Sequence, residues 1–107
     1  MKIETTFGDK IKKLRENENL TLREVSEQLD IDISMLGKIE KNSLRPTKQL
    51  IEKFADLFKV NAEDLTIAFL SDSVAYQVMD DEDLADKVLK VAERKVRYLK
   101  SKKNPLS

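Results

Sequence analysis

The stretch from Leu20 to Lys41, LTLREVSEQLDIDISMLGKIEK, constrains the fold more than any other part of the chain. It predicts two short helices joined by a tight turn. Thr21 and Glu24 have the spacing of a capping box, in which the hydroxyl accepts from a free backbone N–H and the carboxylate reaches back. Asp32 is a good N-cap for the second helix. Asp30 lies where the chain must reverse, and aspartate tolerates the left-handed backbone conformation better than most residues.

Apolar residues at helical spacing would close the inner face of this helix pair, and they are Val25, Leu29, Ile31, Leu36 and Ile39. The pair then presents the outer face of its second helix. In DNA-binding proteins that face enters the major groove.

Further helices are expected on both sides of the pair. One runs from Thr6 to about Asn17, with apolar residues four and three apart on one face. Another runs from about Pro46 to Phe58, and Asn61 caps a fifth. With only two glycines, two prolines and abundant Leu, Lys and Glu, the composition favours an all-α protein.

Four sequence segments carry a resemblance to a known family. They read Phe7-Gly8-x-x-Ile11-x-x-Leu14-Arg15, Leu20-Thr21-x-x-Glu24-Val25-Ser26, Ser34-x-Leu36-x-Lys38-Ile39-Glu40-Lys41-Asn42 and Arg45-Pro46-Thr47. In this order, from Phe7 to Leu65, the chain resembles the lambda-repressor-like, or XRE, family of bacterial helix-turn-helix regulators. The resemblance implies a five-helix domain and an ion pair between Arg15 and Glu40 that joins the first helix to the third.

The resemblance also implies a DNA-binding surface. Base edges would be met by Ile33, Ser34, Gly37 and Lys38. Phosphates would be held by Thr21, Arg23, Lys41, Asn42, Ser43, Arg45 and Lys48. The chemistry fits, since a lysine can donate to guanine O6 and N7 and an exposed isoleucine can pack on a thymine methyl. For two of these residues an alternative without a role in DNA binding stays open. Ile33 would then be an ordinary apolar residue on the surface, and Gly37 would be a helix glycine that is tolerated without a functional reason. Leu22 departs from the family, which often has a phosphate-binding glutamine there.

The charge near the predicted DNA-binding surface agrees with DNA binding, whereas the net charge of the whole chain does not. The net charge of the chain is zero, whereas a nucleic-acid binder is expected to carry excess base. Between Ile33 and Ile51, however, four cations face a single anion, Glu40.

The absent residue types argue against several classes of function. The chain has no cysteine and no histidine, which removes disulfides, the commonest metal ligands and the commonest general base. No Gly-rich phosphate loop is present either. We therefore expect neither an enzyme nor a metal or cofactor site. No signal-peptide pattern and no apolar run of membrane-spanning length is found, so the expected location is the cytoplasm.

The sequence beyond about residue 70 falls outside the resemblance. We expect a helix-turn-helix domain over 1–70, a helical extension over 71–103 and a disordered tail over 104–107. The segment 73–79 is ambiguous, with helix favoured over an extended strand. From Asp81 to about Ser101 an apolar stripe recurs at helical spacing, and its predicted dimer contacts are Leu84, Val88, Leu89, Val91, Ala92, Val96 and Leu99. The alternative is that part of this stripe packs on the domain itself.

Together these features predict a sequence-specific transcriptional regulator that binds a palindromic operator in double-stranded DNA as a homodimer and blocks or recruits RNA polymerase. Within the family that the chain resembles, small stand-alone proteins of this type are similar to controller proteins of restriction-modification systems, which is the expected subtype, and to short phage-type repressors. An extension of about 36 residues is too short for a ligand-binding domain, so no small-molecule ligand is expected. The rival class is a protein-interaction module, such as an adaptor or an antitoxin, which Leu22, Ile33 and the zero net charge favour.

Overall fold

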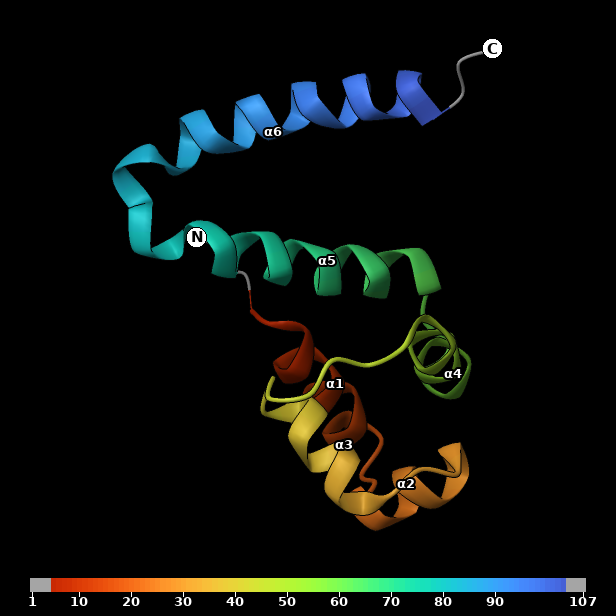
Figure 1. The fold of residues 1–107 in the computed structure, drawn as a ribbon. Helices are drawn as coiled ribbons and strands as arrows, with labels where there is room; N and C mark the ends of the chain where they lie inside the picture. The colour runs from red at the N-terminus through yellow and green to blue at the C-terminus, as the bar shows by residue number, and fades with distance from the viewer. Residues whose placement is uncertain (1–4, 104–107) are drawn as a thin grey trace. The chain divides into compact units, whose positions relative to one another are not determined.

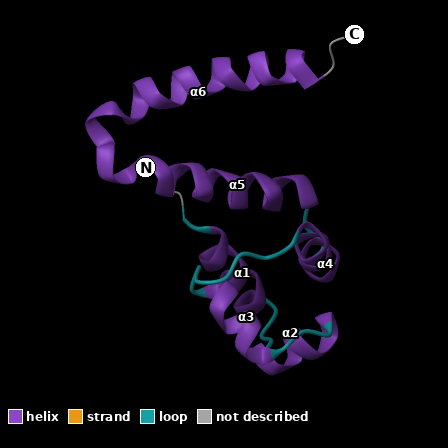
Figure 2. Ribbon diagram, in the orientation of Figure 1, coloured by secondary structure: helices purple, strands orange, loops and turns teal. Residues whose placement is uncertain are grey.

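The computed structural model describes residues 5–103, and all regular secondary structure in that range is helical (Figures 1 and 2). The helices are α1 (Phe7–Asn17), α2 (Leu22–Leu29), α3 (Ile33–Glu40), α4 (Lys48–Phe58), α5 (Ala62–Val78) and α6 (Glu82–Lys103), with a 3-10 turn, η1 (Met79–Asp81), before α6. The predicted all-α class, five helices followed by a long C-terminal helix, is confirmed. The tail expected over 104–107 lies outside the described residues.

The chain divides into two compact units, one up to Asp72 and one from Ser73 onward. The division falls inside α5, because this helix continues to Val78. The ambiguous segment after residue 72 is therefore helical, and it continues an existing helix instead of forming a separate one.

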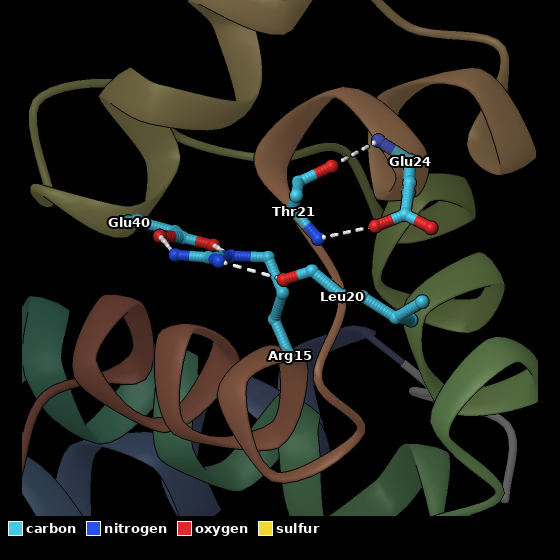
Figure 3. A network of polar contacts seen from close by, with 5 residues as sticks. All are labelled: Arg15, Leu20, Thr21, Glu24 and Glu40. Atoms are coloured by element: carbon cyan, nitrogen blue, oxygen red, sulfur yellow. Dashed lines mark hydrogen bonds and ion pairs between the residues drawn. The ribbon is translucent and has the colours of Figure 1, made fainter.

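Side chains with oxygen acceptors begin the helices of the first unit, as the sequence predicts for several of them. The Thr21 hydroxyl accepts from the Glu24 backbone N–H at 3.0 Å, and the Glu24 carboxylate accepts from the Thr21 N–H at 2.9 Å (Figure 3). The other N-caps are Thr6, Asp32, Thr47 and Asn61. Each such bond satisfies an N–H that has no partner within its helix, and removing one costs roughly 0.5–2 kcal/mol.

Non-glycine residues in the left-handed conformation make the chain reversals. They are Asn19, Asp30, Asn42 and Lys59. Asp30, at φ 55° and ψ 50°, ends α2 and turns the chain toward α3, as predicted. Neither glycine has a positive φ.

The hydrophobic core lies among α1 to α5, where α3 packs on α1 and α2 and α4 contacts both of these (Figure 1). Phe7 is at its centre and is 2% exposed. Its ring meets Phe54 edge-on with centroids 6.3 Å apart and Phe69 with centroids 5.6 Å apart. Edge-to-face pairs of this kind add about 0.5–1.5 kcal/mol to the effect of burial.

Gly8 allows the start of α1 to approach the end of α3 closely. A Cβ atom on Gly8 would lie 2.5 Å from the Glu40 carbonyl oxygen and 2.7 Å from that of Ile39. The Gly8 N–H donates to Asn42 Oδ1 at 2.9 Å, and Asn42 Nδ2 donates to the Thr6 hydroxyl at 2.9 Å. The first helix is thus held against the C-terminal end of the third.

Arg15 and Glu40 make a second connection between α1 and α3. Arg15 Nε donates to Glu40 Oε2 at 2.8 Å and Nη2 to Oε1 at 3.0 Å, while Nη1 donates to the Leu20 carbonyl at 2.9 Å (Figure 3). The two side chains are only 12% and 6% exposed. The hydrogen bonds to Glu40 raise the pKa of Arg15, against the opposing effect of burial. A bidentate pair fixes direction as well as distance.

The two glycines provide a matched pair of variants. Gly8→Ala should lower the free energy of unfolding by about 1–3 kcal/mol, because the new methyl group meets backbone atoms that cannot turn aside. Gly37→Ala should raise it by about 1 kcal/mol, because that position is inside a helix with nothing within 4 Å of the added Cβ. Urea denaturation measures both. Equal effects of the two substitutions would contradict the close approach at Gly8.

Removal of one partner of the Arg15–Glu40 pair should cost about 2–4 kcal/mol, because the remaining charge stays partly buried. A double-mutant cycle with Arg15→Ala and Glu40→Ala should then give a coupling free energy above about 1 kcal/mol. The control is the exposed Glu93–Arg97 pair, whose side chains are 64% and 73% exposed and for which Glu93→Ala should cost less than about 0.5 kcal/mol. Additive effects of the two substitutions would show that the Arg15–Glu40 interaction does not stabilise the fold.

Candidate nucleic-acid interface

The outer face of α3 carries the four residues that the sequence assigned to base reading. Ile33, Ser34, Gly37 and Lys38 lie on the side of the helix opposite the buried Leu36. Ile33 is 39% exposed, and the space around Gly37 is open. The structure therefore brings all four together on one accessible face.

Ser34 has a partner within the chain that limits its chemistry. Its hydroxyl and its backbone N–H both donate to Asp32 Oδ1, each at 2.7 Å. These two bonds lower the pKa of Asp32 below its ordinary value of 3.8, so the cap is intact at neutral pH and is lost as the pH falls below that value. With its proton committed, the Ser34 oxygen is left as an acceptor, which suits the amino groups of adenine and cytosine.

Apart from Arg45, the residues assigned to phosphate fall into two groups. Arg23, Lys41 and Lys48 are exposed cations. Thr21, Asn42 and Ser43 are instead engaged within the chain: the first in the capping box, the second with the start of α1, and the third through a hydroxyl that donates to the Lys38 carbonyl at 3.2 Å.

Thr21, Asn42 and Ser43 differ in whether their side chains still have a proton to donate to a phosphate. Thr21 keeps its hydroxyl proton, because that oxygen accepts in the capping box. Asn42 keeps one of its two amide protons. Ser43 has donated its only side-chain proton, so it would have to release Lys38 before it could hold a phosphate.

Arg45 is held by an aromatic ring that sequence reasoning missed. Its guanidinium carbon lies 5.3 Å from the centroid of the Phe69 ring, within the range of a cation–π contact. Phe69 in turn packs on Phe7. The helix α5 therefore helps to position a cation on the loop between α3 and α4. The spacing of residues 45 and 69 gives no signal of this pairing.

Two other contacts were not foreseen. The Phe7 backbone N–H donates to Asp72 Oδ2 at 2.7 Å, so an aspartate of α5 lies at the positive end of the α1 dipole. Leu22, which occupies the position of the family glutamine, is partly buried against the core. That position thus supports packing in this chain.

An apolar groove of about 270 Å³ lies beside α3, where the loop after it meets α4. The exposed apolar side chains at its rim include Met35 and Leu44, each 37% exposed. Arg45 and Lys53 also line it. No local pattern in the sequence predicts this groove.

Within residues 5–103, none of the helices has both the length and the apolar character needed to cross a membrane. The same residues contain no group of three or more potential metal ligands.

Comparison with known proteins identifies the domain. Neither the curated proteins nor the solved structures provide a match to the chain. A family model described as a helix-turn-helix domain matches residues 8–66, which is more than half of the 107 residues and runs from the start of α1 into α5. The matched region contains α2, α3 and every residue of the surface described above, so the chain belongs to the helix-turn-helix domain family, a family of DNA-binding domains.

Proposed function

We propose that this protein is a sequence-specific DNA-binding regulator of transcription that lays the outer face of α3 in the major groove. The observation that carries the proposal is the exposed surface of Ile33, Ser34, Gly37 and Lys38, on a helix whose opposite face is buried in the core. A helix held rigidly on one side and open on the other is the geometry that a base-reading element requires.

Each side chain has a specific role in this proposal. Lys38 donates to guanine O6 and N7, and Ile33 packs on a thymine methyl. Ser34 accepts from an exocyclic amino group, since its proton is held by Asp32. Gly37 leaves room for the duplex to come close to the helix backbone.

Phosphate contacts would come mainly from the exposed cations Arg23, Lys41 and Lys48, with Arg45 held in position by Phe69. Thr21 and Asn42 contribute the donors that remain to them, and Ser43 contributes only if its bond to Lys38 opens. Such contacts fix the position of a protein on DNA and do not distinguish sequences.

We further propose the lambda-repressor-like, XRE type of regulator, acting as a homodimer on a two-fold operator. Two copies of α3 would enter successive major grooves about 34 Å apart and block or recruit RNA polymerase according to the operator position. Restriction-modification genes or prophage genes are the proposed targets. Control would come from protein concentration through dimerisation.

A protein-interaction module is the second candidate, and the apolar groove beside α3 favours it. Met35 and Leu44 are exposed at its rim, and its volume of about 270 Å³ has room for more than one apolar side chain of a partner. Binding through such a groove would depend weakly on salt. DNA binding through six to ten phosphate contacts loses about three to five orders of magnitude in affinity between about 50 and 200 mM salt.

Two substitutions should separate base reading from anchoring. Lys38→Ala should relax the preference at one base pair by about 1–3 kcal/mol, whereas Arg45→Ala should weaken binding to all sequences alike and reduce the salt dependence. Fluorescence anisotropy on a selected operator and its single-base variants measures both. Lys12→Ala, on the exposed face of α1, is the control and should change neither. A binding constant that does not vary with DNA sequence would refute the proposal.

Gly37→Ala should weaken operator binding by at least about tenfold while the folded protein becomes more stable. The protein itself leaves the added methyl group free of contacts, so any loss of affinity must come from the DNA side. Unchanged affinity would mean that the duplex does not approach α3 at this position.

A further inference from the structure

Helix α6 carries nine apolar residues and buries none of them. The large ones among these side chains are between 37% and 61% exposed. No described residue of the C-terminal unit is buried, so this unit has no core of its own. An amphipathic helix of this kind is marginal in water unless another element covers its apolar face.

The apolar residues of α6 form two adjacent stripes along one side. The first stripe is Ala85, Leu89, Ala92, Val96 and Leu99, and the second is Leu84, Val88, Val91 and Tyr98. The first stripe keeps a spacing of four and three throughout, and the second keeps it except that Lys95 takes the position between Val91 and Tyr98. This spacing is that of a helix that pairs with another helix. The surface is hollowed along this side, and the small Ala92 allows close approach there. The hollow is lined by Leu84, Lys87, Val88, Val91, Ala92 and Lys95.

The charged residues of η1 and α6 are separated by sign along the chain. Five anions and no cation lie between Asp80 and Asp86, whereas eight cations and one anion lie between Lys87 and Lys103. A helix of 22 residues is about 33 Å long, which is several times the Debye length of about 8 Å at physiological salt. The charges at one end of α6 are therefore screened from those at the other end, and each end can attract a partner by itself. Lys90, Arg94 and Arg97 fall on the side of the helix away from the stripes.

The separation of acidic and basic residues along α6 favours a second α6 helix as the partner, and it favours one relative direction of the two helices. A parallel pair of α6 helices would bring acid against acid and base against base. An antiparallel pair brings the acidic end of each helix to the basic end of the other. We therefore propose that a second copy of this chain covers the apolar face of α6, with the two helices antiparallel and centred near Ala92.

The midpoint follows from the limits of the apolar face. Its residues run from Leu84 to Leu99, so a two-fold axis through the middle of the face passes beside Val91 and Ala92. In that arrangement Ala92 faces its own counterpart, and Ala85 faces Leu99 of the other copy. This inference specifies the dimer on which the proposed function rests.

Cysteine cross-linking tests the arrangement directly, because the chain has no cysteine of its own. Under mild oxidation Ala92→Cys should form a disulfide-linked dimer, while Ala85→Cys alone should not. Co-expressed Ala85→Cys and Leu99→Cys chains should cross-link to one another. Arg94→Cys, on the opposite side of the helix, is the matched control for random collision. Non-reducing gels give the cross-linked fraction, and sedimentation equilibrium of the unmodified protein gives its mass in solution.

A cross-link of Ala85→Cys to itself would show a parallel pair and overturn the inference. Cross-linking of Ala92→Cys no greater than that of Arg94→Cys, together with a monomeric mass, would overturn it as well. Failure here is distinguishable from failure of the proposed function. Cross-linking depends on α6, whereas base preference depends on α3 and is measured by the effect of Lys38→Ala.

Discussion

The attachment of α1 to the C-terminal end of α3 is the constraint on which the rest of the structure depends. It has two parts that converge on Glu40: Gly8 brings the start of α1 against the Glu40 carbonyl, and Arg15, two turns later, grips the Glu40 carboxylate. Together they fix the axis and the rotation of α3. Because Leu36 and Ile39 then point into the core, the face of α3 that carries Ile33, Ser34, Gly37 and Lys38 remains accessible to a ligand.

Local features of this fold were readable from the sequence, and contacts between distant residues were not. The capping box, the left-handed Asp30 and the caps at Asp32 and Asn61 depend on neighbours three residues away or fewer. Residues that meet only in the folded chain left no local signal. Gly8 and Asn42 are 34 residues apart, and Phe7 and Asp72 are 65 apart. The Arg15–Glu40 pair is also distant, and only the family resemblance pointed to it.

The candidate site shows the same limit in a different form. Sequence position was enough to bring Ile33, Ser34, Gly37 and Lys38 onto one face, because helical periodicity alone determines this. It was not enough to say which polar groups still have a proton to donate. Ser34 and Ser43 are both serines beside the proposed DNA surface, yet both hydroxyls are committed to other atoms of the chain. Hydrogen-bonding capacity is thus a property of the folded surroundings and not of the residue type.

Within residues 5–103 the chain makes four left-handed turns without using glycine, at Asn19, Asp30, Asn42 and Lys59. A residue with a Cβ atom is strained in this conformation, but it also restricts the unfolded ensemble more than glycine would. The left-handed conformation of Asp30 therefore has a cost in free energy relative to the right-handed and extended conformations that aspartate prefers in the unfolded chain. The packing of α2 on α3 offsets this cost, so tertiary contacts, and not the local preference of the turn residue, maintain the angle between the two helices.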